Sequence, residues 1–491
     1  MRILLIYPQY SHSSEFDSRA PSMSLFYIAS MLERHGHEVV IYDASLGPIV
    51  KTGQVFRYGD SDSHVYDFLS ASKFDIVGIT CSFNARWKFV SRLAQQVKRL
   101  FAEVPVVAGG LFPTYEWEYC LNSCSSVDFV MLGEAELSFV NVVNNLARGY
   151  DINDSCKGIG GVAWKVKDGL FCNPKVEFNN NLDDLPLPAW HLADLDKYFQ
   201  LQKNIFELPA PCLPILSSRG CPNRCTFCNM YVTHGRHWRS RSAENVLDEI
   251  EYLKTKFGVK HFYFIDDNFS ANLKRAKRIC SGILERQLKI KYNFHNGLSI
   301  NAIDNELVRL MKKSGCTSVC LAVESGSERI RNGVYKKNLK TEKIIEVFNW
   351  YRKAKIPTIG YFMVGAPGET REDFEESRKL MAKLPMSLAT VGIYTPYPGT
   401  QLYDECKEKG WLIEPSIEDD SRVEMFSSML RTPDFEPEDV AGWQKQLYIS
   451  FVRYHWFTLI KEALRPMGVV NRDMIGKFIG LLKFRNQVKA V

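Results

Sequence analysis

One stretch of sequence decides how the whole chain is interpreted: Ser218-Arg219-Gly220-Cys221-Pro222-Asn223-Arg224-Cys225-Thr226-Phe227-Cys228-Asn229-Met230. Its three cysteines have the spacing C-x3-C-x2-C. Thiolates this close in sequence can each bind one iron of a single cubane iron–sulfur cluster. No fourth cysteine follows at ferredoxin spacing, so one iron would keep an open position that the amino and carboxylate groups of a small molecule can chelate. The stretch therefore predicts a cluster site on Cys221, Cys225 and Cys228.

The three cysteines have two other interpretations. With His234 or His237 they could form a structural zinc site. They could also be reduced, metal-free core residues, although three cysteines in eight positions beside Gly220 and Pro222 would fill a core poorly. The motifs that follow the stretch favour the cluster.

Length and composition indicate a large globular protein. The 491 residues predict about three domains of ~150 residues each, and the hydrophobic and charged fractions are globular values. The net charge of +6 is spread along most of the chain, which does not indicate a nucleic-acid partner. The apolar start Met1–Pro8 is too short for a signal peptide, and the sequence has no apolar stretch long enough to span a membrane.

The thirteen cysteines are scattered, which fits thiols in a reducing cytoplasm rather than a disulfide framework. Two further close pairs, Cys120/Cys124 and Cys316/Cys320, could bind a second metal but are interpreted as ordinary buried thiols.

Residues 1 to about 195 alternate short apolar runs with amphipathic helical patterns. The strand candidates are Arg2–Tyr7, Glu38–Tyr42, Ile76–Thr80, Val104–Ala108 and Phe129–Leu132, with helices such as Leu25–Arg34 and Phe89–Phe101 between them. This alternation predicts a doubly wound parallel sheet covered on both faces. Ligands of such sheets bind outside the carboxyl ends of the strands, where this sequence has small or polar residues: Tyr7, Pro8, Cys81, Ser82, Gly109, Gly110, Gly133 and Glu134.

These residues, in this order, resemble the cobalamin-binding domain that is fused to many radical S-adenosylmethionine (SAM) enzymes. The resemblance rests on Pro8 after the first strand, Met23-Ser24-Leu25 opening the first helix, Ala108-Gly109-Gly110, and Leu132-Gly133-Glu134-Ala135-Glu136. It implies cobalamin bound by the eight strand-end residues. The motif D-x-H-x-x-G, whose histidine binds cobalt from below, is absent after the first strand; Asp62–Asp67 matches it in part and is interpreted as a loop. A domain that keeps the fold without the cofactor is the alternative.

A less regular region connects to the next domain. Gly158–Trp164 predicts a hairpin strand, and Leu185–Trp190 is a proline-punctuated linker.

Residues 196 to 405 contain the cysteine stretch within a series of alternating strand and helix patterns. The predicted elements are strands at Leu213–Ser217, His261–Ile265, Tyr292–Asn296, Val319–Glu324, Thr358–Val364 and Val391–Thr395, with a helix at Ala243–Phe257. This order predicts a partial (β/α)6 barrel, whose functional residues lie at the carboxyl ends of the strands.

The cysteine spacing with Phe227 before the third cysteine resembles the signature of the radical SAM superfamily. Matching segments follow later strands, including Ala322-Val323-Glu324-Ser325-Gly326, where the family commonly has glycine in place of Ala322. The resemblance implies a [4Fe–4S] cluster on the three cysteines and SAM at its open iron. Asp266 or Asp267 would receive the SAM amino group, and Glu324 would bind on the ribose side. The full set of residues expected to contact SAM is Phe227, Asp266, Asp267, Asn268, Asn296, Glu324, Ser325, Gly365 and Tyr394.

Residues 406 to 491 predict a helical segment, with an aromatic helix at Trp443–Leu464. The last 45 residues have a basic excess: Arg453, Lys461, Arg465, Arg472, Lys477, Lys483, Arg485 and Lys489 against Glu462 and Asp473. The segment is interpreted as a capping helical bundle with a solvated basic face. A substrate-cavity wall and contact with a membrane surface are the alternatives.

The resemblance implies a cytoplasmic, cobalamin-dependent radical SAM enzyme. It would methylate an unactivated carbon of a small molecule or biosynthetic intermediate, using methylcobalamin and a 5′-deoxyadenosyl radical. An external electron donor of the flavodoxin or ferredoxin type is implied. The alternatives are a non-methylating radical step, such as oxidative cyclisation or ring rearrangement of the magnesium-porphyrin cyclase type, and a non-catalytic cluster or corrinoid sensor.

Overall fold

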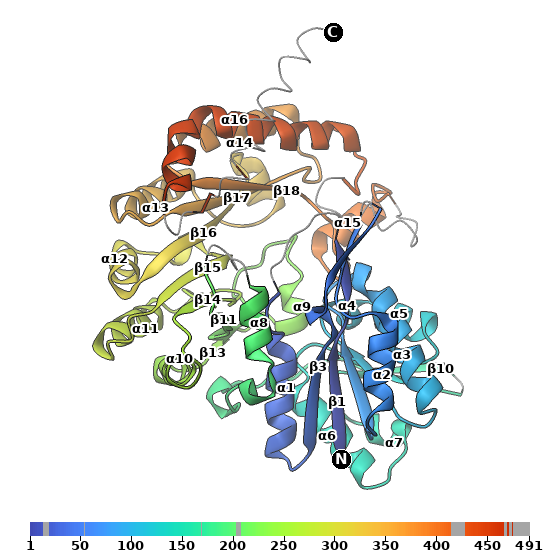
Figure 1. Ribbon diagram of the computed structural model, residues 1–491. Coiled ribbons are helices and arrows are strands. Elements are labelled where there is room, and N and C mark those ends of the chain that lie inside the picture. The colour runs from blue at the N-terminus through green and yellow to red at the C-terminus, as the bar shows by residue number, and fades with distance from the viewer. Residues whose placement is uncertain are drawn as a thin grey trace. The chain divides into compact units, whose positions relative to one another are not determined.

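The computed structural model describes residues 1–12, 19–53, 55–167, 169–202, 208–413, 428–465, 469–470 and 474 (Figure 1). The chain divides into two compact units. The first unit comprises Met1–Ile205 with Met230–Gly235, and the second comprises Phe206–Asn229 with Arg236–Val491. The predicted three-part division at residues 195 and 405 stays a prediction.

The first unit is built on a seven-stranded sheet with the order β10-β9-β8-β7-β6-β1-β3. The strands are β1 (Arg2–Tyr7), β3 (Glu38–Asp43), β6 (Ile76–Thr80), β7 (Val106–Gly109), β8 (Phe129–Met131), β9 (Val162–Val166) and β10 (Gly169–Asn173). Strands β3, β1, β6, β7 and β8 are parallel, whereas β9 and β10 are antiparallel additions at the edge. The order of the strands reverses direction between β1 and β6, and ligands of open parallel sheets bind at such a point.

Helices cover both faces of this sheet because its central strands β1, β6, β7 and β8 are apolar on both sides. Leu4 and Ile6 of β1 belong to a core cluster with Val65 of α2 (Asp62–Ser70) and Val90 of α3 (Trp87–Leu100). On the other face, α1 (Met23–Arg34) packs on β1, β3 and α6 (Glu136–Ala147). The remaining elements of this unit are α4 (Leu111–Tyr115), α5 (Trp117–Ser123), α7 (Ile152–Cys156), α8 (Leu195–Leu201), α9 (Met230–His234) and a small antiparallel sheet of β2 (Tyr10–His12), β5 (Val55–Tyr58) and β4 (Ile49–Thr52).

The second unit is built on a six-stranded parallel sheet whose spatial order follows the chain, β11-β14-β15-β16-β17-β18. The strands are β11 (Cys212–Ile215), β14 (His261–Phe264), β15 (Lys291–Leu298), β16 (Cys316–Glu324), β17 (Thr358–Val364) and β18 (Leu388–Ile393). The helices are α10 (Ala243–Phe257), α11 (Leu273–Glu285), α12 (Asn305–Ser314), α13 (Thr341–Lys353), α14 (Arg371–Lys383), α15 (Gln401–Glu408) and α16 (Pro437–Ala463). This is the predicted partial barrel, followed by the predicted C-terminal helix.

Local sequence signals set the helix ends. Ser242 caps α10 by accepting a hydrogen bond from Asn245 N, and Gly258 ends the helix in the left-handed conformation at φ 68°. Thr370 and Asp373 form a capping box at the start of α14. The serine cap and the terminal glycine of α10 explain why the predicted helix Ala243–Phe257 agrees with the observed one.

The sequence interpretation of Asp62–Asp67 as a loop is wrong. These residues form the first turns of α2, because Ser61 accepts a hydrogen bond from His64 N and nucleates the helix. All thirteen cysteines are free thiols, and the pairs Cys120/Cys124 and Cys316/Cys320 are buried as predicted.

Among the described residues, none of the helices is both long enough and apolar enough to cross a bilayer. The predicted basic residues Arg472, Lys477, Lys483, Arg485 and Lys489 lie outside the described residues.

Candidate functional site

The start of the cysteine loop is fastened to the carboxyl end of the neighbouring strand β14. Asp266 accepts hydrogen bonds from Ser217 N and from the hydroxyl groups of Ser217 and Ser218. Burial raises the pKa of Asp266, while Arg275 and the serine donors oppose that shift. Asp267 Oδ2 accepts from Gly220 N at 2.8 Å. The two aspartates that the sequence singled out therefore position the loop.

Both ends of the loop are held together by a short antiparallel pair. β12 (Ser218–Arg219) precedes the three cysteines and pairs with β13 (Arg239–Ser240) beyond them. Gly220 adopts φ 77°, a conformation that favours glycine at the turn into the loop. The loop thus leaves the sheet at a defined point.

The middle of the loop is anchored to the opposite side of the barrel mouth. Thr226 donates from its backbone N to Tyr335 O and from its hydroxyl to Val334 O, and it accepts from Leu402 N. The Phe227 ring packs edge-on against Tyr335, with 4.9 Å between ring centroids. The aromatic residue of the sequence signature therefore fixes the loop between two cysteines.

The three thiols are half-buried at the mouth of the sheet. Asn268 Nδ2 lies 3.5 Å from Cys221 Sγ and donates toward it. Burial raises the pKa of Cys225, while the nearby Lys337 opposes that effect. Amide donors to sulfur tune the potential of thiolate-bound clusters, so the polar contacts suit a thiolate cluster.

The zinc interpretation receives no support from the geometry. Within the described ranges, no three His, Cys, Asp or Glu side chains converge closely enough to hold a single metal ion. Neither His234 nor His237 completes such a group. A cubane is compatible with thiols that do not converge on one point, since each thiolate binds a different iron.

Glu324 forms an ion pair that the sequence reasoning missed. Its Oε1 lies 2.6 Å from Lys337 Nζ, and both side chains are only 11% exposed. Glu324 has φ 66°, and the pairing of β16 with β17 shifts register between Ala322 and Glu324. Strain of this kind clusters at functional sites. Lys337 follows the π-helix Arg329–Val334, and no sequence spacing relates it to Glu324.

Two residues expected to contact SAM form hydrogen bonds with other groups of the protein. Ser325 Oγ lies 3.2 Å from Ser377 Oγ of α14, and Ser325 is fully buried. Asn296 Nδ2 donates to Ile265 O at 2.8 Å. Their roles toward SAM stay predictions.

A buried polar cluster surrounds the end of β17. Glu369 Oε2 accepts from Gly365 N at 2.6 Å and from Ala366 N at 3.0 Å. Among the described residues, Glu369 Oε1 and Tyr335 OH are buried without a hydrogen-bond partner. Tyr394 lies beside Tyr335, with 6.2 Å between ring centroids. Buried polar atoms without partners are costly, so their presence at the strand ends fits a polar ligand.

The first sheet brings its predicted strand-end residues to one edge. β1, β6, β7 and β8 are adjacent and parallel, so Tyr7, Pro8, Cys81, Ser82, Gly109, Gly110, Gly133 and Glu134 line that edge.

Backbone packing shapes this edge. Gly110 has φ 110°, and a Cβ there would lie 2.6 Å from Cys81 O. Thr114 Oγ1 accepts from Gly133 N at 3.0 Å, and burial raises the pKa of Cys81 to about 12. Small residues at adjacent strand ends let a ligand approach the backbone closely, which fits cobalamin.

Arg86 is a second residue that the sequence reasoning missed. Its guanidinium group lies over the rings of Tyr10 at 4.5 Å, Tyr7 at 5.2 Å and Phe83 at 5.5 Å, and it donates to Tyr7 OH. The cation is therefore held beside the carboxyl end of β1 by aromatic rings. The aromatic residues are too dispersed in sequence to reveal this arrangement.

Comparisons with known proteins agree with this geometry. Residues 215–381 match the radical SAM superfamily, and residues 14–143 match the B12 binding domain. The chain is 29% identical to an uncharacterized methyltransferase of Pyrococcus horikoshii, over 95% of this chain and 98% of the relative. It is 27% identical to a cytidylyl-2-hydroxyethylphosphonate methyltransferase of Streptomyces wedmorensis, over 79% and 78%. An anaerobic magnesium-protoporphyrin IX monomethyl ester cyclase of Rubrivivax gelatinosus is 26% identical over 83% and 70%.

Two solved structures share the fold. The cobalamin-dependent SAM radical enzyme OxsB matches with a TM-score of 0.74 and 16% identity, over 99% of this chain and 71% of that protein. The radical SAM methyltransferase TsrM from Kitasatospora setae matches with a TM-score of 0.71 and 18% identity, over 92% and 89%.

Proposed function

The chain belongs to the cobalamin-dependent radical SAM enzymes, and we propose that it methylates an unactivated carbon of a small-molecule substrate. One observation carries the proposal: a single chain combines a clamped three-cysteine loop at one parallel sheet with small strand-end residues at the switch point of another. The methyltransferases that align over most of their length support methylation.

The cofactors of this family are a [4Fe–4S] cluster, SAM and cobalamin. When bound, they supply an electron, hydrogen-atom abstraction and a methyl group, respectively. Cys221, Cys225 and Cys228 would hold the cluster, and the edge of β1, β6, β7 and β8 would hold cobalamin.

We assign binding of the amino acid end of SAM to the ion pair of Glu324 and Lys337. Glu324 offers a carboxylate to an ammonium or hydroxyl group, and Lys337 offers an ammonium to a carboxylate. The pair is mostly shielded from water, where charge-assisted hydrogen bonds are strong. Asp266 and Asp267 would then act on the cluster loop, since their oxygens accept from Ser217, Ser218 and Gly220.

The test uses the anaerobically reconstituted full chain with SAM, cobalamin and dithionite. Methylation predicts release of both S-adenosylhomocysteine and 5′-deoxyadenosine. Release of 5′-deoxyadenosine without S-adenosylhomocysteine would instead support a non-methylating radical reaction, the activity named for the cyclase relative. Release of neither product would leave only a sensor function and contradict the proposal.

We also propose an external flavodoxin- or ferredoxin-type electron donor, because the cluster requires a low-potential electron at each turnover. A cytoplasmic location is proposed because all thirteen cysteines are free thiols. The basic C-terminus suggested contact with a membrane surface as an alternative, and the exposed residues of α16 bear on that alternative.

A further inference from the structure

α16 has a buried side and an exposed side. Trp443, Leu447, Phe451 and Leu459 are buried at helical spacing, so they form the core-facing side. Away from the core, Gln446, Ser450 and Arg453 recur at helical spacing before the break in helical geometry at His455. Phe457, Ile460 and the C-cap residue Leu464 recur at the same spacing after the break. We call these six residues the outer stripe.

The outer stripe becomes strongly apolar toward the end of the helix. Phe457 is 87% exposed, Leu464 75% and Ile460 38%, and the adjacent Tyr454 is 53% exposed. Phe457 and Leu464 are among the most exposed large hydrophobic side chains of the described residues. Packing in the protein core does not explain these two apolar side chains, because the buried side of the helix makes the core contacts. Contiguous exposed apolar side chains mark interaction surfaces.

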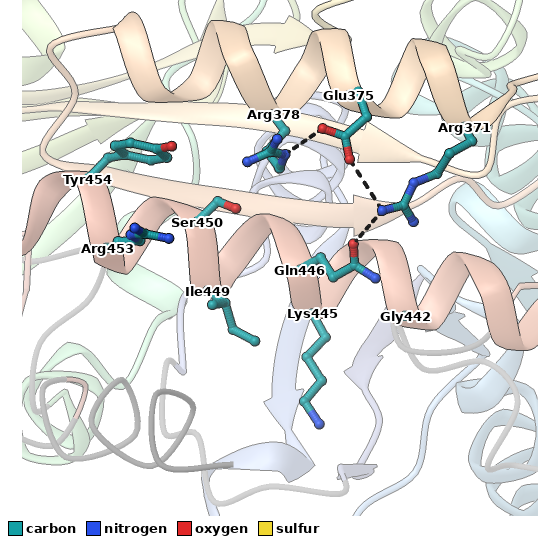
Figure 2. A pocket seen from close by; sticks show the side chains of 10 residues that line it. All are labelled: Arg371, Glu375, Arg378, Gly442, Lys445, Gln446, Ile449, Ser450, Arg453 and Tyr454. Atoms are coloured by element: carbon teal, nitrogen blue, oxygen red, sulfur yellow. Dashed lines mark hydrogen bonds and ion pairs between the residues drawn. The ribbon is translucent and has the colours of Figure 1, made fainter. Parts of the chain in front are cut away.

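The polar half of the outer stripe borders a basic groove. This groove of 460 Å³ lies between α14 and α16, and its lining includes Arg371, Arg378, Lys445 and Arg453 with Glu375. Figure 2 shows Glu375 between two arginines; it lies 3.2 Å from Arg371 and 2.7 Å from Arg378. Glu375 pairs with both Arg371 and Arg378, and Arg453 adds a third guanidinium group to the lining, so the groove keeps a positive excess.

The basic character continues beside the apolar residues. Lys461 follows Ile460 in the sequence, whereas Arg465, which follows Leu464, is paired with Glu462 at 2.7 Å. In the sequence, residues 466–491 contain five basic residues against Asp473. α16 departs from helical geometry at His455, with φ −113° and ψ 15°, which separates the groove from the apolar end.

We propose that the outer stripe and the basic groove dock the protein on an anionic lipid surface. The apolar side chains would enter the interface between headgroups and acyl chains, and the arginines would bind lipid phosphates. A second copy is a poorer occupant, because a two-fold interface would place the same cations against each other. The chain's own C-terminal residues are also a poorer occupant, because they carry the same sign of charge as the groove. The proposal is independent of the proposed function.

The experiment is sedimentation of the full-length holoprotein with sucrose-loaded vesicles. Vesicles of phosphatidylcholine alone are compared with vesicles that also contain phosphatidylglycerol. We expect binding to the anionic vesicles that weakens as salt is raised. Phe457→Ser with Leu464→Ser should lower the partition coefficient by at least about tenfold, and Arg378→Glu with Arg453→Glu should do the same.

Matched controls use exposed residues away from α16. Val176→Ser removes a side chain that is 73% exposed, and Lys313→Glu reverses an exposed charge; both should bind as the wild type does. Thermal unfolding of every variant checks that the fold persists. Absence of vesicle binding, or binding that the α16 variants leave unchanged, overturns the proposal. Light scattering that shows a dimer lost in Phe457→Ser, without vesicle binding, would reassign the stripe to a second copy.

Discussion

The two parallel sheets of this protein prepare their carboxyl ends in different ways. At the second sheet, charged and polar side chains do the positioning: Asp266, Asp267 and Glu369 bind backbone or hydroxyl donors, and Glu324 binds Lys337. At the first sheet, small residues and backbone contacts shape the edge, as Gly110 against Cys81 shows. The comparison teaches that hydrogen bonds specify the edge of the second sheet, whereas close backbone packing shapes the edge of the first.

The largest effect is expected at the cysteine loop. Replacing Cys221, Cys225 and Cys228 together by alanine should abolish the visible iron–sulfur absorption and SAM cleavage, because no other group replaces three thiolates. The fold should persist, since the loop is also held by Asp266, Asp267 and Thr226. Absorption spectra and circular dichroism after anaerobic reconstitution check this. Zinc occupying the wild-type site after reconstitution would contradict the cluster.

The next effect tests the polar chemistry of the second edge. Glu324→Ala should slow 5′-deoxyadenosine release by on the order of 10²-fold, if the contact holds the reactive geometry, without changing the cluster spectrum. Lys337→Ala should weaken SAM binding, measured by calorimetry, by about tenfold. Lys340→Ala, an exposed lysine nearby, is the matched control. Wild-type SAM affinity in Lys337→Ala would place the cofactor elsewhere.

At the carboxyl edge of the first sheet, a larger side chain should lower stability and cobalamin retention. Gly110→Ala is expected to lower the free energy of unfolding by roughly 1–3 kcal/mol and to reduce retention of cobalamin, because its Cβ would meet Cys81 O. Gly109→Ala should change the free energy of unfolding little, because its Cβ would lie 3.6 Å from the nearest atom, Met131 Cβ. Denaturant unfolding and the corrinoid absorption of the purified protein measure both. Equal behaviour of the two variants would contradict a sterically shaped edge.

The smallest effect concerns the pH dependence of stability. Burial raises the pKa of Glu369 to about 7, above its unfolded value near 4.5. The folded protein therefore binds the extra proton, and the contribution of Glu369 to stability is complete below about pH 4.5 and is lost as pH rises to 7. Glu369→Gln can keep the accepting oxygen, so it should remove this slope and stabilise the protein above pH 7 by on the order of 1–2 kcal/mol. Unfolding midpoints between pH 5 and 8 provide the measurement, and parallel profiles would contradict the assignment.

The sequence by itself determined the order of the elements, both sheet classes and the ligand-bearing loop. Apolar runs alternating with helical patterns predict parallel sheets, because each helix returns the chain so that successive strands run in the same direction. β1, β6, α10 and β17 begin and end where the patterns indicate. The cysteine spacing is a local property, so the candidate cluster ligands were also readable from sequence. Asp62–Asp67 is helical rather than the predicted loop, because the hydrogen bond from His64 N to Ser61 Oγ starts α2.

Only the tertiary structure decided which polar groups meet. Lys337 reaches Glu324 because a π-helix and a register shift bring them together, and Arg86 reaches Tyr7 and Tyr10 across separate strand ends. The tertiary structure also shows that Asp266 accepts hydrogen bonds from Ser217 and Ser218. Side-chain pairing across a sheet depends on distances between residues far apart in sequence. Periodicity and spacing describe only neighbours along the chain, so they locate the edges where ligands bind but not the partners that each side chain has there.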